Sequence, residues 1–413
     1  MTSNFPDLAE QSVSIIAHVD NFAINHDLFH SHRIVKPSAG TIIDRKGRLE
    51  LSGWVIGKHL PVIAVEVFLD NQLIGELPTD IERPGLIQRF GELIEKQNVK
   101  FGFRQILNLP TLLNEQSLII KAVFSNADRV SIGQIDCKSC STEQIIQNGV
   151  GPDFIIIGAM KAATSAIYDY LQRHPQVVPR RPKEVNFFSK PPKPYQKSWG
   201  WYLSLFTGRA EYSRQHGLSP EQLLMGDASP SYISHPDSPA RIKATFPKVK
   251  LIASLRNPTE RAISHYHHQV KRVKDEQRSL EEAFSVANLE QAVEAMSLHG
   301  DNVPLFRTLD TWNTSRYLLH GQYAAQLKNW FSVFPKEQIL IIDYHDLEHR
   351  PKKFLEELFG FLELDTPIID DLEKVYANSY SSPPSEIKER LNEYFQPFNQ
   401  ELKNLLNRDF KWF

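Results

Sequence analysis

The loop that follows the apolar segment 154–157 contains residues suited to binding an anion. Gly158 permits a tight exit from a strand, Lys161 supplies a full positive charge, and Thr164 and Ser165 supply hydroxyl donors. If a helix begins there, its N-terminus adds unpaired backbone N–H groups and partial positive charge. The pattern predicts a phosphate-binding loop, although an ordinary strand-to-helix turn with a surface lysine fits this loop taken alone.

The same loop differs from a common nucleotide-binding motif. Ala162 and Ala163 keep the backbone open to the close approach of a ligand. A Walker A loop needs G-x-x-x-x-G-K-[ST], and here no glycine stands directly before Lys161. A magnesium-dependent kinase or NTPase of the P-loop type is therefore disfavoured.

A second segment repeats this geometry about 100 residues later. Asn257 is a good helix N-cap, Pro258 suits the first helical position, and Glu260 stands at the capping-box position. Arg256 then lies at the end of the preceding strand, where its guanidinium could hold a phosphate through two hydrogen bonds. Ser264, further along the helix, could donate to the same group. A salt bridge at the sheet edge and a solvent-facing serine are the alternatives.

A third segment, Lys183-Glu184-Val-Asn-Phe-Phe, pairs a carboxylate with a lysine in front of two aromatic residues. Glu184 could accept a proton from an acceptor hydroxyl, and Lys183 could stabilise charge on a group in transfer. A charged loop anchored by the two phenylalanines is the alternative.

Neither histidines nor cysteines form a convincing metal site. His265, His267 and His268 follow Arg256 on the expected helix, and could line a cleft, but their spacing matches no metal triad. Cys137 and Cys140 are the only cysteines, and no second pair completes a zinc site. We interpret the cysteines as incidental thiols, with redox or metal roles as alternatives.

Composition excludes several classes of partner. The 413 residues suggest about two or three domains. The formal net charge is −2, so no overall field attracts nucleic acid or an anionic membrane. The N-terminus has no apolar run suited to a transmembrane helix or signal peptide, which makes a cytoplasmic location the expectation.

Hydrophobic patterning divides the chain into three parts. Residues 1–37 lack sustained periodicity and are expected to form an irregular arm. Residues 38–140 contain period-2 apolar runs separated by Asp, Asn and Gly turns, which predict a small β-sandwich-like accessory domain. This domain could bind carbohydrate, although core packing explains Trp54 and the other aromatic residues equally well.

Residues 150–413 have a different pattern. The short apolar strands expected at 154–157, 249–255 and 338–344 alternate with helical segments. This alternation predicts an α/β fold with a parallel sheet flanked by helices. Ligands bind such sheets where strands end and helices begin, which is where the segments 158–165 and 255–264 are expected to lie.

Together the motifs resemble those of the PAPS-dependent sulfotransferase superfamily, especially the branch with heparan sulfate sulfotransferases and bacterial relatives. PAPS is 3′-phosphoadenosine 5′-phosphosulfate, and its by-product is PAP. The resemblance is ordered and spans roughly residues 153–413. Its motifs are the 5′-phosphosulfate loop at 158–165, the K-E-x-x-F-F segment at 183–188, the 3′-phosphate motif at 255–264 and the C-terminal segment at 394–412.

The resemblance implies a sulfotransferase fold and a role for each motif residue. Lys161, Thr164 and Ser165 would hold the 5′-phosphosulfate, and Arg256 and Ser264 would bind the 3′-phosphate. The implied donor-binding set comprises Gly158, Lys161, Ala162, Ala163, Thr164, Ser165, Arg256 and Ser264.

The resemblance also implies a catalytic set of Glu184, Lys161 and Lys183. Glu184 would activate the acceptor hydroxyl, Lys161 would neutralise the departing phosphate, and Lys183 would steady the sulfuryl oxygens. No metal would be required, because lysine and the helix dipole take the role that magnesium plays in phosphoryl transfer.

Two departures from the family pattern concern donor and catalytic contacts. Relatives that act on heparan sulfate often carry E-K-x-x-x-Y-F, and the nearest match, at 227–233, has Ala228 in place of the lysine. The basic, glycine-containing loop that closes over the nucleotide in those relatives has no charged counterpart at 378–382.

The acceptor is expected to be a saccharide hydroxyl or amine, with a small-molecule natural product as the alternative. A basic stretch near Glu184 would suit an acidic glycan, though a solvated loop explains it equally well; it consists of Arg180, Arg181, Lys190 and Lys193. A non-catalytic nucleotide-binding protein is a further alternative, against which Glu184 argues.

Overall fold

The computed structural model describes most of the chain. The described residues are 14–21, 27–36, 41–43, 48–83, 86, 90, 92, 100–109, 116–140, 146–147, 149–180, 183–189, 202–203, 205–297, 315–365 and 383–412. The chain forms two compact units, residues 1–151 with 192–223, and residues 152–191 with 224–413. The predicted domains, 38–140 and 150–413, assign residues 192–223 to the second domain, whereas the structure groups these residues with the first unit. The predicted domain boundaries stay predictions.

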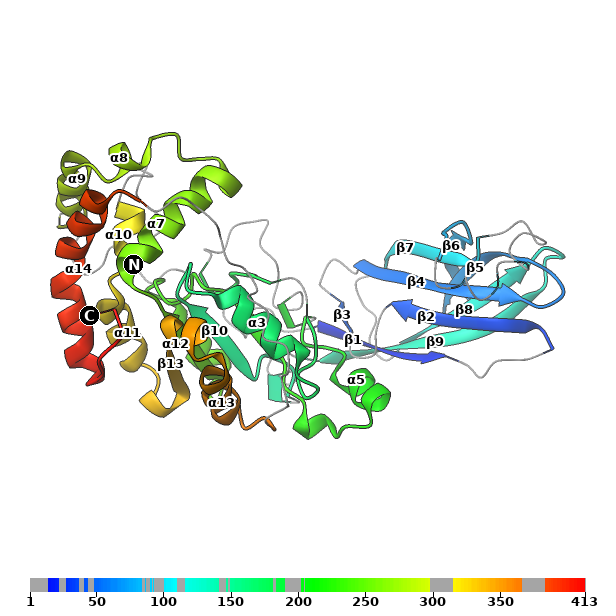
Figure 1. Cartoon of the computed structure of the whole chain (residues 1–413). Coiled ribbons are helices and arrows are strands. Elements are labelled where there is room, and N and C mark those ends of the chain that lie inside the picture. The colour runs from blue at the N-terminus through cyan, green and yellow to red at the C-terminus, as the bar shows by residue number, and fades with distance from the viewer. Residues whose placement is uncertain are drawn as a thin grey trace. The chain divides into compact units, whose positions relative to one another are not determined.

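The first unit is built on antiparallel strands (Figure 1). One sheet has the order β3-β1-β9-β8-β5-β6 and the other β2-β4-β7. The strands are β1 (Ser14–Asn21), β2 (Phe29–Lys36), β3 (Thr41–Ile43), β4 (Arg48–Gly57), β5 (Val62–Leu69), β6 (Gln72–Pro78), β7 (Gly102–Asn108), β8 (Gln116–Phe124) and β9 (Arg129–Cys140). Two helical segments of the unit, α5 (Arg209–His216) and η2 (Pro220–Gln222), lie later in the sequence.

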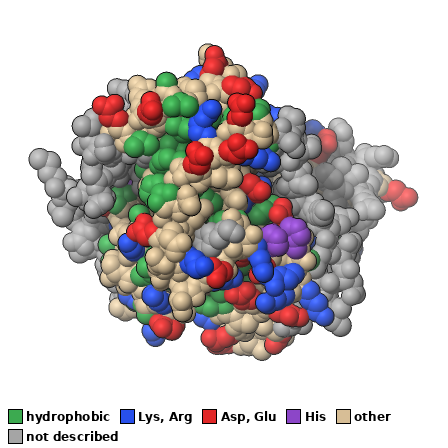
Figure 2. Space-filling view, turned by 60° about the vertical axis from the view of Figure 1, so that its left-hand side comes forward, with side chains coloured by type: hydrophobic (Ala, Val, Ile, Leu, Met, Phe, Trp, Pro, Cys, Tyr) green, Lys and Arg blue, Asp and Glu red, His purple; other side chains and the backbone are tan. Residues whose placement is uncertain are grey.

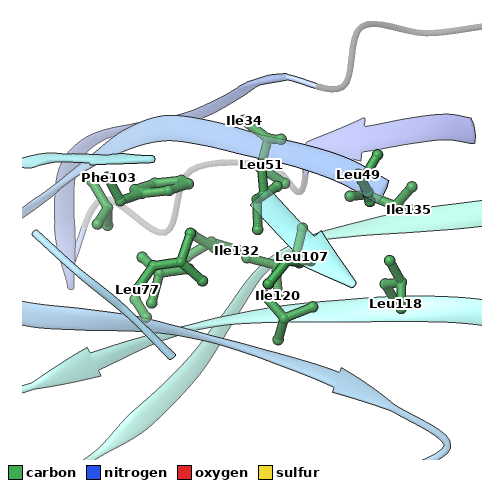
Figure 3. Close-up of a cluster of buried hydrophobic side chains, with 14 of the residues drawn as sticks. Ile34, Leu49, Leu51, Leu77, Phe103, Leu107, Leu118, Ile120, Ile132 and Ile135 are labelled. Carbon is green, nitrogen blue, oxygen red and sulfur yellow. The ribbon is translucent and has the colours of Figure 1, made fainter. Parts of the chain in front are cut away.

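Alternating side chains from both sheets form one hydrophobic core in this unit (Figure 3). Leu49 and Leu51 of β4 share it with Leu118 and Ile120 of β8. The period-2 pattern thus places every second residue between the sheets, and the predicted sandwich-like architecture is confirmed.

The irregular arm predicted for residues 1–37 is wrong over much of its length. Residues 14–21 form β1, which pairs with β9 along its whole length, and residues 29–36 form β2, which pairs with β4. The pairing partner of β1 is more than 100 residues away, so no local turn or periodicity indicates the pairing.

Cys137 lies in β9 within this core, and burial raises the pKa of its thiol to about 11. A buried, protonated thiol fits the interpretation of an incidental cysteine. Across the described part of the chain, no group of three or more His, Cys, Asp and Glu side chains is arranged to hold a metal ion.

The second unit contains a four-stranded parallel sheet with the order β11-β10-β12-β13. Its strands are β10 (Phe154–Gly158), β11 (Gly226–Ala228), β12 (Lys250–Leu255) and β13 (Ile339–Asp343). Phe154 and Ile156 of β10 pack with α3 (Thr164–Arg173) and α13 (Pro351–Leu362) in one core cluster. The predicted α/β fold with a flanked parallel sheet is confirmed.

The remaining helices of this unit connect the strands or pack together in a second cluster (Figure 1). They are α6 (Ser238–Thr245), α7 (Pro258–His268), the π-helical η3 (Gln269–Val273), α8 (Leu280–Ala283), α9 (Val286–Ser297), α10 (Ser315–Leu319), α11 (Tyr323–Phe331), η5 (Lys336–Gln338), α12 (Tyr344–His349) and α14 (Ser385–Leu406). Among the described helices, none has the length and apolar character that crossing a membrane requires.

Candidate active site

The loop between β10 and α3 has the shape that its sequence predicts. Lys161 and Ala163 both adopt the left-handed backbone region, with φ of 71° and 57°, and Ala163 stands at the N-cap of α3. A Cβ atom at Gly158 would overlap the side chain of Ile233, so the strand exit requires glycine for packing. Thr164 begins α3, which places its backbone N–H among the unpaired donors of the first helical turn.

Lys161 lies in a partly buried, cation-rich environment. Burial lowers the pKa of its ammonium group, and Arg256, Lys183 and Arg261 lower it further, while Glu184 opposes them. Several cations therefore meet at the carboxyl edge of the sheet, which is an arrangement that an anionic ligand would stabilise.

Arg256 extends from the end of β12 toward this loop. Its Nη1 lies 3.5 Å from the carbonyl oxygen of Lys161, and its guanidinium carbon lies 4.7 Å from the ring centroid of Tyr344. Its Nε and Nη2 each lie 3.2 Å from Oε2 of Glu260. The arginine is thus held between a loop, an aromatic face and an exposed carboxylate, with 16% of its side chain exposed.

The start of α7 positions Arg256 as predicted. The Asn257 side chain accepts hydrogen bonds from the backbone N–H groups of Thr259 and Glu260, at 2.9 and 3.3 Å. The Glu260 side chain binds Arg256 and does not complete a capping box with Asn257. Ser264 is buried on α7, so the alternative of a solvent-facing serine is wrong.

The segment after residue 182 brings the third motif to the same loop. The Lys183 ammonium group contacts Oγ of Ser165 and lies 3.5 Å from Oε1 of Glu184. Burial lowers the pKa of Lys183, and Glu184 opposes this shift. The Glu184 side chain is 53% exposed, so a carboxylate beside the cation cluster is open to an incoming acceptor.

Hydrogen bonds to the segment 227–232 fix the backbone at Glu184 and at Asn186. The backbone N–H of Glu184 donates to the carbonyl oxygen of Ala228 at 2.9 Å, and that of Asn186 donates to Oγ of Ser229 at 3.0 Å. Ser229 and Tyr232 in turn donate to the buried Asp227 carboxylate, each at 3.1 Å. By sequence, Asp227 stands at the acidic position of the E-K-x-x-x-Y-F match, but no role was predicted for it.

Ala228 occupies the position where relatives often carry a lysine. Its side chain is buried in the core cluster of β10, α3 and α13, and no lysine reaches the site from this position. Lys183, at Ser165, is the cation beside Glu184. Residues 378–382, where the sequence has no charged counterpart of the basic closing loop, lie outside the described residues.

The prediction of a basic stretch near Glu184 is wrong for its first residue, Arg180. Arg180 is buried, and it binds the carboxylate of Asp227 and the carbonyl oxygen of Gly226 at 3.1 and 2.8 Å. Its positive charge therefore lies in the protein interior, beside the buried carboxylate of Asp227, and not at the surface near Glu184. Arg181, Lys190 and Lys193 lie outside the described residues.

His265 and His268 of α7 have different environments. His265 is buried beside Gln269 and Tyr317, and burial lowers its pKa well below the usual value. His268 is half-buried; burial lowers its pKa, Lys161 lowers it further, and Glu184 opposes the shift. His268 therefore lies within electrostatic range of both charged groups, one turn beyond Ser264 on α7.

Arg261 is a further cation that the sequence did not single out. It is fully buried on α7, and its Nη2 donates to the carbonyl oxygen of Tyr317. Among the described residues, its Nε and Nη1 have no hydrogen-bond partner. Burial lowers its pKa to about 10, and the nearby Arg256 acts in the same direction.

Known proteins are similar to this part of the chain. A family model described as "Sulfotransferase domain" matches residues 151–408, which is more than half of the chain. A membrane-associated sulfotransferase of Dictyostelium discoideum is 30% identical over 63% of this chain and 66% of its own length. The bifunctional heparan sulfate N-deacetylase/N-sulfotransferase 2 of Bos taurus is 28% identical over 62% of this chain and 30% of its own length. The chain thus spans less than two thirds of each of these curated relatives.

A solved structure, a sulfotransferase from Alicyclobacillus acidocaldarius, is 28% identical with a TM-score of 0.47. The match covers 63% of this chain and 97% of that one.

Proposed function

The chain belongs to the sulfotransferase family, whose members use PAPS, and we propose that it transfers the sulfuryl group of PAPS to a saccharide hydroxyl and releases PAP. The observation that carries this proposal is the convergence of Lys161, Arg256 and Glu184 at the carboxyl edge of one parallel sheet. Two cations for a doubly phosphorylated nucleotide stand there beside one exposed carboxylate.

The residues at this edge fit the donor's charge. Lys161, Thr164 and Ser165, with Gly158, Ala162 and Ala163 shaping the loop, hold the 5′-phosphosulfate at the N-terminus of α3. Arg256 and Ser264 bind the 3′-phosphate from the neighbouring strand and helix. The lowered pKa of Lys161 fits this role, because a bound dianion would offset both its burial and its repulsion from Arg256.

Glu184 is the base of the proposed transfer step. Its carboxylate takes the proton of the acceptor hydroxyl while the hydroxyl oxygen forms a bond to sulfur. The bond between sulfur and the bridging phosphate oxygen breaks, and its electron pair leaves with PAP. Lys161 neutralises the charge that develops on this phosphate, and Lys183, which contacts Ser165, steadies the sulfuryl oxygens.

The proposed step requires no metal. Lys161, Lys183 and the N-terminus of α3 supply positive charge where magnesium would act in phosphoryl transfer. Transfer should therefore persist after exhaustive chelation of divalent cations.

A saccharide acceptor is supported by the exposed position of Glu184 and by the matched relatives. The side chain is 53% exposed, which suits a large acceptor that approaches from solvent. The similar bovine enzyme is named for heparan sulfate N-sulfation. A small-molecule alcohol or amine remains the second candidate because Glu184 would serve either acceptor.

One experiment tests donor and acceptor together. Purified protein is incubated with PAPS and a mixed panel of saccharides and small alcohols, and products are identified by mass spectrometry. A mass gain of one sulfate on a saccharide supports the proposal. In parallel thermal-shift assays, PAP should stabilise the protein. If ATP–magnesium stabilises the protein and PAP does not, the proposed sulfotransferase function is refuted.

A further inference from the structure

The π-helical turn that follows α7 presents three basic side chains to solvent. Lys271 and Arg272 lie in η3, and Lys274 follows it in the left-handed backbone region with φ of 61°. All three residues are exposed, as are the interleaved Val270 and Val273, whose side chains are 37% and 52% exposed. We call these three basic residues the η3 strip.

The acidic residues next to the η3 strip are already paired with other arginines. Asp275 lies 3.1 Å from Nη1 of Arg316, and Glu276 lies 2.7 Å from Nη2 of Arg278. Within the described part of the chain, no ion pair or hydrogen bond involves the side chains of the η3 strip. The strip is therefore a local excess of positive charge on a chain whose net charge is −2.

The continuous helix from Pro258 to Val273 links this strip to Ser264, which is proposed to bind the 3′-phosphate. Ser264, His268 and Arg272 are spaced four residues apart, so they follow one side of the helix. At about 1.5 Å per residue, Ser264 and Arg272 are separated by about 12 Å along the helix axis. Between them, His268 lies within electrostatic range of Lys161, Glu184 and Arg272.

We propose that the η3 strip binds the carboxylate or sulfate groups of an anionic saccharide chain while a neighbouring sugar unit reacts at Glu184. This inference rests on the proposed sulfotransferase function and narrows its acceptor to polyanionic glycans. Three unpaired cations complement several negative charges on one chain, and the two exposed valines offer apolar contact to the carbohydrate. Single π-helical turns within α-helices often occur at functional sites.

The three cations of the η3 strip form a short local group on a chain whose net charge is −2. On the face of the molecule shown in Figure 2, acidic and basic side chains are interspersed. An anionic surface such as a lipid vesicle would need a broad basic area, whereas a single saccharide chain needs only a short line of cations.

The test compares two double variants in the full-length protein. K271Q/R272Q removes two charges from the strip. K248Q/K336Q removes two lysine charges beside the amino-terminal ends of β12 and β13, at the opposite edge of the sheet. Initial rates with saturating PAPS are measured on a carboxylated and sulfated oligosaccharide and on an uncharged oligosaccharide of equal length.

We expect K271Q/R272Q to raise the KM for the anionic acceptor about tenfold and to flatten its dependence on salt, because fewer ion contacts remain. The KM for the uncharged acceptor and the Kd for PAP should stay within twofold, and K248Q/K336Q should behave as wild type. The charge-retaining variant K271R/R272K should have the wild-type KM for the anionic acceptor. This result would show that the rise in K271Q/R272Q comes from loss of charge and not from misfolding.

Several outcomes would overturn the inference. The strip has no role in acceptor binding if K271Q/R272Q leaves the KM for the anionic acceptor unchanged. The same conclusion follows if this variant raises the KM for the uncharged acceptor equally, or if K248Q/K336Q raises the KM for the anionic acceptor equally. Strip-dependent binding to phosphatidylserine vesicles, with none to the anionic oligosaccharide, would assign it to a membrane surface. If the wild type transfers no sulfate from PAPS to any acceptor, the proposed function itself fails, and binding of the oligosaccharide without donor still decides the role of the strip.

Discussion

Arg180 and Asp227 form an ion pair that is closed to solvent, with Nη2 of the arginine 3.1 Å from Oδ1 of the aspartate and side chains 2% and 0% exposed. The same carboxylate accepts hydrogen bonds from Ser229 and Tyr232, whose hydroxyl groups hold the backbone at Asn186 and Phe188. The ion pair therefore supports the segment that carries Glu184.

Removing one partner of this pair should be more harmful than removing both. Asp227→Ala should lower the free energy of unfolding by about 3–5 kcal/mol, because it removes the carboxylate that the buried Arg180 guanidinium binds. The double variant R180M/D227L should lose less than the sum of the single variants, as measured by urea unfolding in a double-mutant cycle. Strict additivity would show that the two charges act independently.

Lys161→Ala and Glu184→Gln should both abolish detectable transfer, but for different reasons. Loss of Lys161 removes a charge that holds the donor, so we expect PAP binding to weaken about 100-fold or more in calorimetric titration. Glu184→Gln keeps the side-chain shape and removes only the base, so PAP binding should change less than threefold while turnover falls at least about 100-fold. Lys248→Ala, at the opposite edge of the sheet, is the control, and wild-type turnover in Glu184→Gln would exclude this residue as the base.

Glu260→Gln should tighten donor binding. Both Nε and Nη2 of Arg256 bind the Glu260 carboxylate, which would compete with the proposed 3′-phosphate for the same donors. Since Glu260 is 52% exposed, the gain should be modest, about two- to fivefold in the Kd for PAP. Glu281→Gln, in the first turn of α8, is the matched control for loss of a charge at a helix N-terminus. Weaker PAP binding in Glu260→Gln would instead mean that Glu260 orients Arg256.

Stability should fall as the solution is acidified below about pH 6.5, the ordinary pKa of histidine. Burial lowers the pKa of His320 to about 3, and Arg261 acts in the same direction. The folded protein therefore keeps His320 neutral while the unfolded chain takes up a proton. The loss amounts to about 1.4 kcal/mol per pH unit between the unfolded and folded pKa values.

The variant His320→Asn removes this titration. Its thermal unfolding midpoint, followed by calorimetry from pH 7.5 to 5.0, should fall less steeply than that of the wild type. His265 stays in the variant, so part of the pH dependence remains. Identical slopes would show that His320 is protonated without cost in the folded protein.

Local sequence patterns predicted the backbone elements that carry Lys161 and Arg256 well. The strand exit at Gly158, the Asn257 cap and the position of Arg256 at a strand end follow from propensities within about ten residues. These elements form where expected because parallel strands bring their carboxyl ends to one edge of a sheet.

Contacts between distant segments could not be predicted. The role of Arg180 depends on Asp227, 47 residues later, and the strand β1 exists because β9 offers a partner. Tyr344 reaches Arg256 only through the pairing of β12 with β13. Each depends on tertiary packing that composition and periodicity do not encode.

The unbroken helix from Pro258 to Val273 has a consequence for the product. The helix joins Ser264, which is proposed to bind the 3′-phosphate, to the η3 strip, while Glu184 lies on a separate segment. If the strip recognises sulfate, each newly modified unit becomes an anchor for the next encounter. Sulfation would then make a saccharide chain a better acceptor for its next encounter with the proposed site.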